Sequence, residues 1–71
     1  MEKVYSVVCE NAEYGDIVFD EYCEKETVEA ALERAYGFCR ENGYSIVSTE
    51  DSKTYWDGKV YYTKVVSVTA A

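Results

Sequence analysis

The spacing of hydrophobic residues changes twice along this chain, and the change limits the class of fold more than any other feature. In the middle of the sequence the apolar residues recur every three or four positions, as on one face of an α-helix: Val28, Ala31, Leu32, Ala35, Phe38 and Cys39. On both sides of this segment they alternate with polar residues, as in half-buried strands. The sequence therefore predicts one helix between two strand-rich segments. Thr27 is suited to the N-cap of this helix, and Gly43, after Asn42, to its end.

Two strands are predicted before the helix, from Lys3 to Glu10 and from Asp16 to Cys23, because both segments are rich in β-branched and aromatic residues. The five residues between them end in Gly15, which favours a hairpin and an antiparallel pair. Alternation assigns one set of side chains to the core, namely Tyr5, Val7, Cys9, Ile17 and Phe19. Asp16 and Asp20 are expected on the opposite face.

Two more strands are predicted after the helix, from Tyr44 to Thr49 and from Lys59 to Thr69. Asp57 and Gly58 form a two-residue turn signal between aromatic segments, since both residues tolerate positive φ. The polar residues 50–53 predict a loop or bulge before that turn. The inner face of the last strand is expected to carry Val60, Tyr62, Val66 and Val68, interrupted by Lys64.

These elements predict a single α+β domain over residues 1–71 in the order β-β-α-β-β. The most economical arrangement is an antiparallel four-stranded sheet with the helix packed on one face. Such a sheet leaves its other face to solvent, to a partner or to a second copy of the chain.

The residue types present exclude several kinds of chemistry. Histidine is absent, so nucleophilic triads and the usual proton shuttle are missing. Phosphate-binding glycine loops and calcium-loop spacing are also missing, and the three cysteines form no C-x-x-C pair. We therefore expect no enzyme, no cofactor and no metal site, and we interpret Cys9, Cys23 and Cys39 as free, mostly buried thiols. The apolar runs are far shorter than the roughly 18 to 20 residues that cross a bilayer, and no basic and apolar leader follows Met1, so we expect a cytoplasmic protein.

The formal charge of −7 is concentrated between Glu10 and Glu33, where nine acidic residues stand against Lys25 alone. A concentrated acidic surface repels nucleic acid and membranes and is attracted to basic grooves. Solubility is an alternative reason for surface charge. Clustering costs self-repulsion, however, and this favours a basic partner. The acidic residues assigned to partner binding are Asp16, Asp20, Glu21, Glu24, Glu26, Glu29 and Glu33, which could imitate a line of phosphates.

Aromatic residues crowd around the Asp57-Gly58 turn, and Tyr55, Trp56 and Tyr61 are assigned to the same partner surface. Tyr and Trp are common in interface hot spots. Cross-strand aromatic pairs also stabilise hairpins without any partner. Stacking beside Lys53 and Lys59 could hold single-stranded nucleic acid, but the negative charge of the chain opposes this alternative.

The small size, the β-β-α-β-β plan and the acidic stretch from Glu10 to Glu33 resemble small phage-encoded anti-defence proteins, including anti-CRISPR proteins. This resemblance implies a non-enzymatic inhibitor that occupies the basic nucleic-acid-binding groove of a CRISPR-type effector complex in the host cytosol. The alternative is a structural or regulatory module that self-associates as a homodimer through its open sheet face or a strand edge.

Overall fold

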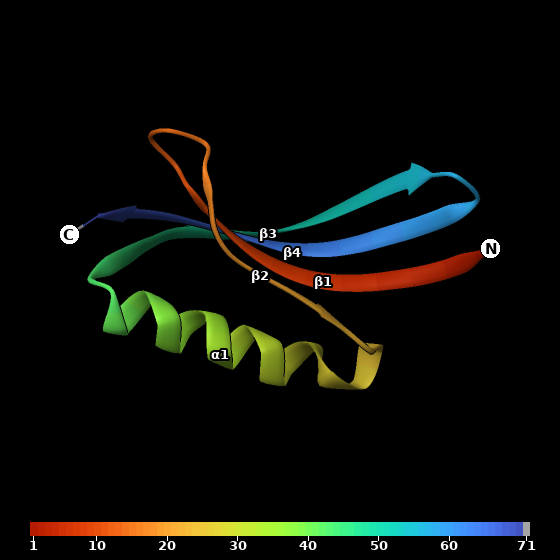
Figure 1. Ribbon diagram of the computed structural model, residues 1–71, viewed down its shortest axis with the longest axis horizontal. Coiled ribbons are helices and arrows are strands. Elements are labelled where there is room, and N and C mark those ends of the chain that lie inside the picture. The colour runs from red at the N-terminus through yellow and green to blue at the C-terminus, as the bar shows by residue number, and fades with distance from the viewer. Residues whose placement is uncertain (71) are drawn as a thin grey trace.

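The computed structural model describes residues 1–70 and consists of a twisted sheet with one helix packed against one of its faces (Figure 1). The element order confirms the predicted α+β class. The elements are β1 (Glu2–Asn11), β2 (Ile17–Cys23), a short 3₁₀ turn η1 (Lys25–Thr27), α1 (Val28–Glu41), β3 (Tyr44–Trp56) and β4 (Lys59–Ala70).

The sheet is mixed, so the prediction of a fully antiparallel sheet was wrong. Its strand order is β2-β1-β4-β3, and β1 runs parallel to β4 through ten residue pairs. The chain leaves β2 at one edge, passes along α1 beneath the sheet and re-enters as β3 at the other edge (Figure 1). The β3–β4 hairpin then returns β4 to the centre, beside β1. Side-chain alternation defines which face of a strand is buried, but it carries no information on strand order.

The core lies between α1 and the two central strands. Val7 and Cys9 of β1 and Val66 and Val68 of β4 are completely buried, and α1 covers them with Ala31, Ala35 and Cys39. The two alanines allow the helix to approach the sheet closely. Phe38 extends the core toward the sheet edges, because its ring lies 5.5 Å from the ring of Phe19 and 6.1 Å from that of Tyr44. The predicted apolar stripe of the helix is therefore the face that meets the sheet.

The β1–β2 hairpin is antiparallel, as predicted, but Ile17 is not a core residue. The pairing shifts between Cys9 and Glu10, so Cys9 faces Phe19 while Glu10 faces Ile17. This bulge moves Ile17 to the face opposite the core, where 61% of its surface is exposed. The alternation used for the prediction holds only in a strand without a bulge.

The second hairpin confirms the predicted turn and contradicts the predicted loop before it. Asp57 and Gly58 both adopt positive φ, 48° and 74°, as a two-residue hairpin turn requires. Residues 50–53 continue β3 without interruption, and Asp51 pairs with Lys64 at 2.8 Å between carboxylate and ammonium. The irregularity in β3 lies instead between Ile46 and Ser48.

The ends of α1 lie where they were predicted, but the capping hydrogen bonds agree with the prediction only at the C-terminal end. Gly43 has φ of 72° and its N–H donates to the carbonyl of Arg40, as expected at a helix end. Thr27 occupies the N-cap but makes no side-chain cap, because its hydroxyl donates to the carbonyl of Glu24 instead. Within residues 1–70, no helix has the length and hydrophobicity needed to cross a membrane.

Candidate partner-binding site

The acidic residues between Glu10 and Glu33, except Glu21, lie in two groups on different layers of the molecule. The first, here the hairpin patch, lies on and beside the β1–β2 loop and consists of Glu10, Glu13, Asp16 and Asp20. The second, here the helix patch, lies along η1 and the first turns of α1 and consists of Glu24, Glu26, Glu29 and Glu33. In Figure 1 the β1–β2 loop projects from the sheet on the side away from α1. The predicted acids therefore do not form a continuous strip.

The hairpin patch has a rigid support. The side chain of Asn11 accepts hydrogen bonds from the backbone N–H groups of Glu13 and Tyr14, at 2.9 and 3.1 Å. Its backbone N–H donates to the carbonyl of Asp16 at 2.7 Å, and its carbonyl accepts from the N–H of Gly15 at 2.7 Å. Because these bonds close the loop, the backbone carrying two of the four acids is fixed before any partner arrives.

The hairpin patch is also uncompensated. Residues 10–20 contain four acidic residues and no Lys or Arg. Three ion pairs occur in the part of the chain that the structure describes, and none includes a member of this patch. Asp20 lies opposite Val8 on the open face of the sheet, and its carboxylate is exposed. The patch thus presents a charge of −4 to solvent.

The helix patch is partly offset by nearby bases. Its four acids are exposed, but Lys25 lies within the same segment, so residues 24–33 carry −3. Lys64 of β4 lies on the face of the sheet that carries α1. Its pKa is raised, first by its pairing with Asp51 and to a smaller extent by the charge of Glu29. The helix patch is therefore less negative than its number of carboxylates indicates.

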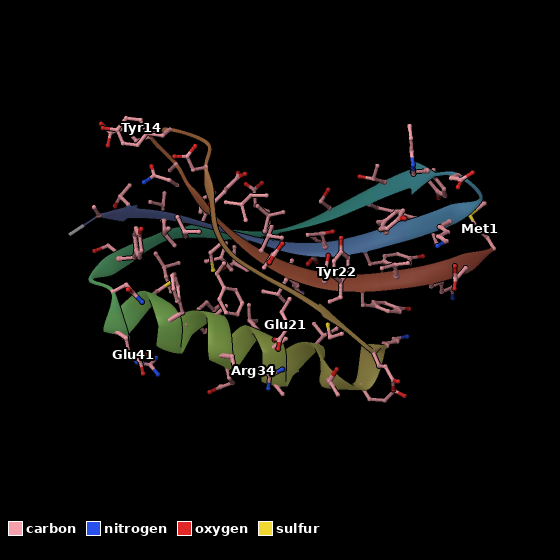
Figure 2. All side chains as sticks on the ribbon, in the orientation of Figure 1. Met1, Tyr14, Glu21, Tyr22, Arg34 and Glu41 are labelled. Carbon is pink, nitrogen blue, oxygen red and sulfur yellow. The ribbon has the colours of Figure 1, made fainter. Side chains whose placement is uncertain are left out.

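Glu21 belongs to neither patch, because it is engaged with the helix. Its two carboxylate oxygens accept hydrogen bonds from Arg34 Nε at 3.1 Å, and Oε2 also accepts from Nη2 at 2.9 Å (Figure 2). Glu21 points to the α1 side of the sheet, whereas its neighbour Asp20 points to the open side. Sequence position alone could not separate these two adjacent acids.

The aromatic residues around the second turn are divided between the two faces. Trp56 and Tyr61 lie on the open face, and Tyr55 lies on the face that carries α1. Tyr55 and Trp56 are 60% and 72% exposed, and Tyr61 is half-buried. Lys53 lies with Tyr55, 5.4 Å from its ring centroid, so this lysine and Trp56 do not share one nucleic-acid-binding platform.

The open face of the sheet exposes large hydrophobic side chains. Ile17, Tyr22 and Trp56 are 61%, 73% and 72% exposed, and they come from the two edge strands, β2 and β3. Between them, the Ser6 and Thr63 hydroxyls of the parallel pair β1–β4 lie 3.0 Å apart. This face remains a candidate for self-association or for an additional partner contact.

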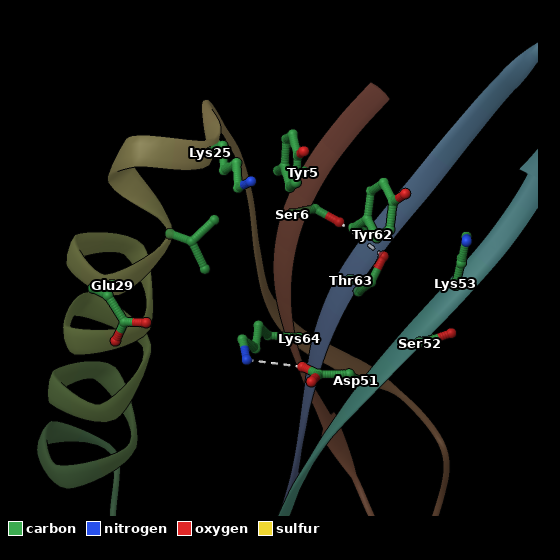
Figure 3. Close-up of a pocket in the computed structure, with 11 residues that line it drawn as sticks. Tyr5, Ser6, Lys25, Glu29, Asp51, Ser52, Lys53, Tyr62, Thr63 and Lys64 are labelled. Carbon is green, nitrogen blue, oxygen red and sulfur yellow. Dashed lines mark hydrogen bonds and ion pairs between the residues drawn. The ribbon is translucent and has the colours of Figure 1, made fainter. Parts of the chain in front are cut away.

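Two groups of residues were missed by the sequence analysis. Glu10 and Glu13 complete the hairpin patch, and their membership in the same acidic stretch was a usable signal. The second group lines a pocket of about 500 Å³ between the start of α1 and the uncovered end of the sheet, and includes Tyr5, Tyr62, Lys25, Lys53 and Lys64 (Figure 3). Lys53 was noted in the sequence beside the aromatic residues, but the group as a whole has no sequence signal, because the parallel pairing of β1 with β4 places Tyr5 beside Tyr62 and η1 carries Lys25.

The thiols agree with their interpretation as core residues. Cys9 and Cys39 are buried with sulfur atoms 4.0 Å apart, Cys23 is half-buried, and all three are free. Burial, followed by the proximity of Cys39, raises the pKa of Cys9 from 9.0 to about 12. This thiol is therefore kept protonated rather than activated as a nucleophile. Nowhere in residues 1–70 do three His, Cys, Asp or Glu side chains gather as metal ligands.

Comparisons with known proteins found no matching protein-family model, no matching curated protein and no matching solved structure.

Proposed function

We propose that this protein is a non-enzymatic inhibitor that docks its hairpin patch into the basic nucleic-acid-binding groove of a partner. The partner class suggested by the resemblance is a CRISPR-type host defence complex. The observation that carries the proposal is the uncompensated charge of Glu10, Glu13, Asp16 and Asp20 on a loop fixed by Asn11.

Electrostatics and loop geometry support the hairpin patch as the first point of contact. A fixed loop loses little conformational entropy on binding, which favours affinity. Its charge steers it toward a surface rich in Lys and Arg, where it takes the place of phosphates. The helix patch, partly offset by Lys25, contributes to the long-range attraction of the same partner.

Charge reversal in two matched variants tests the proposal. One variant changes Glu10, Glu13, Asp16 and Asp20 to Lys, and the other changes Glu24, Glu26, Glu29 and Glu33 to Lys. Each raises the net charge from −7 by 8, so both have the same formal charge of +1. Gel-shift assays measure target DNA binding by a panel of purified guide-RNA effector complexes in the presence of each protein.

We expect the wild-type protein to reduce DNA binding by at least one complex, and inhibition to weaken as salt rises. The hairpin variant should lose inhibition, whereas the helix-patch variant should retain most of it. Equal loss in both variants would mean that net charge, rather than the hairpin patch, is responsible. Absence of inhibition across the panel would contradict the proposed partner class. Circular dichroism of both variants controls for folding.

A second candidate function is self-association through the open face of the sheet, favoured by the exposure of Ile17, Tyr22 and Trp56. A C2 dimer formed in this way would bury apolar side chains and would be insensitive to salt. Sedimentation velocity of wild type and of the Tyr22→Ser and Trp56→Ser variants distinguishes the two candidates. A salt-independent dimer lost in these variants supports self-association, and a monomer at high concentration excludes it.

A further inference from the structure

We infer that the pocket between η1 and the uncovered end of the sheet binds a small planar aromatic anion. This inference concerns a different surface from the hairpin patch and does not depend on the proposed partner. The pocket has a volume of about 500 Å³, within the range of roughly 300 to 1,000 Å³ typical of ligand pockets. It exists because α1 begins at Val28 and leaves the part of the sheet near the second hairpin uncovered (Figure 1).

Positive charge is concentrated in this pocket, although the protein as a whole is strongly acidic. Three of its seven basic residues line it, Lys25, Lys53 and Lys64, together with two acids, Glu29 and Asp51. The lining thus carries a net charge of +1, against −7 for the chain. Lys64 is held by Asp51, and this pair leaves the other two ammonium groups to meet an anion.

Lys25 is the most informative of the three. Glu24 and Glu26 are its sequence neighbours, yet no ion pair of Lys25 is found within residues 1–70. Figure 3 shows its ammonium directed toward Tyr5, at the mouth of the pocket. A lysine between two glutamates that points into a pocket supplies an available positive charge at that position.

The tyrosines of the pocket determine the shape of ligand that fits. Tyr5 and Tyr62 stack on each other, with ring centroids 5.3 Å apart and planes 14° from parallel. The Lys53 ammonium lies over the Tyr62 ring at 5.5 Å. The ring of Tyr62 thus has Tyr5 stacked on it and Lys53 over it, so a ligand ring would meet Tyr62 at its edge. Aromatic edges carry partial positive charge and pack well against the face of another ring.

The ligand therefore needs a flat ring and an acidic group. The ring would lie against Tyr5 and the edge of Tyr62, beside Val28, and the acid would lie beside Lys25, at the end of the tyrosine row opposite Lys53. Either an aromatic carboxylate or a nucleotide has this chemistry. The tyrosines, Lys53 and Lys64 lie on the paired strands β1, β3 and β4, and Lys25 lies on η1, so the sheet side of the site is formed before binding.

Titrations followed by ¹H–¹⁵N NMR test the inference with four probes: 2-naphthoate, AMP, 2-naphthamide and inorganic phosphate. We expect 2-naphthoate, AMP or both to shift the amide signals of Tyr5, Tyr62 and Lys64 saturably, with a Kd on the order of 1 mM. Binding of 2-naphthoate alone would indicate an aromatic carboxylate as the ligand, and binding of AMP alone would indicate a nucleotide. The amide and the phosphate should bind much more weakly, because each lacks one half of the required chemistry.

Two lysine variants provide matched controls. Lys25→Gln should weaken binding roughly tenfold, since it removes a charged hydrogen-bond donor. Lys59→Gln removes the same charge from the other face of the sheet, near Glu2, and should leave binding unchanged. Both side chains are at least partly exposed, so the spectra of the free variants should retain the wild-type fold. Failure of both ring-bearing anions to bind at 10 mM, equal binding of 2-naphthamide, equal binding of phosphate, or equal weakening in both variants would overturn the inference.

Discussion

The thiol of Cys9 makes the stability of this protein depend on pH in the alkaline range. The side chain is completely buried, and its pKa rises from 9.0 to about 12 on folding. Between these values the unfolded chain loses the proton while the folded chain keeps it, so deprotonation favours unfolding. The contribution of Cys9 is fully present below pH 9 and is lost as pH rises toward 12.

The size of this effect follows from the two pKa values. One pKa unit corresponds to about 1.36 kcal/mol. Linkage then gives a loss in the free energy of unfolding on the order of 1 kcal/mol at pH 10 and on the order of 3 kcal/mol at pH 11. For a domain of 71 residues, whose total stability is on the order of 5 kcal/mol, this is a large fraction.

Urea unfolding of wild type and Cys9→Ala at pH 7, 9, 10 and 11, under reducing conditions, measures the contribution directly. Alanine lowers stability at every pH through the cavity it leaves, but it cannot ionise, so the difference between the two proteins should shrink as pH rises. Tyrosine ionisation affects both proteins and cancels. Cys23→Ala is the matched control: burial also raises the pKa of Cys23, but this thiol is half-buried and should contribute less. Parallel stability curves for wild type and Cys9→Ala from pH 7 to 11 would refute the reasoning.

Two further substitutions test the local structure by chemical denaturation. Gly58→Ala should lower the free energy of unfolding by about 1 kcal/mol, because Gly58 has φ of 74°. Gly37→Ala should raise the free energy of unfolding by up to about 1 kcal/mol, because alanine favours the helix and its new Cβ would meet its nearest neighbouring atom at 3.8 Å, an ordinary contact. A change of the same sign in the free energy of unfolding for both substitutions would contradict these expectations. A double-mutant cycle on Glu21 and Arg34 should give a coupling below about 1 kcal/mol that falls in high salt, because the Arg34 side chain is 55% exposed and that of Glu21 is 31% exposed. A coupling unchanged in 1 M salt would contradict the description of this pair as a surface interaction.

Short-range features of the fold could be predicted from the sequence because their causes are local. The 3.6-residue period placed the core face of α1, and the Asp57-Gly58 pair placed the second hairpin turn, where positive φ is needed at both residues. Gly43 marked the end of the helix for the same reason. Each of these signals depends on backbone preferences within a few residues of the site.

Long-range features could not be predicted because alternation fixes the face of a strand and not its neighbours. The parallel pairing of β1 with β4 depends on how α1 crosses beneath the sheet. The bulge that turns Ile17 outward shifts register by one residue, and this reverses the expected face of Ile17, while Phe19 and Asp20 keep the faces that alternation predicts. Residues 50–53 are polar because they lie on an exposed edge strand, not because the chain leaves the sheet.

The same limits explain why the candidate site was predicted in part. The acidic stretch was visible in the sequence, but its division follows from three-dimensional placement: Asp20 and Glu21 are adjacent, yet one faces solvent on the open side and the other is bound to Arg34. A single docking surface cannot include both. Under the proposed function, the hairpin patch and the helix patch would therefore contact different surfaces of the partner or act at different stages of association. The matched charge reversals separate these roles, because long-range attraction depends on total charge and the bound contact depends on its position.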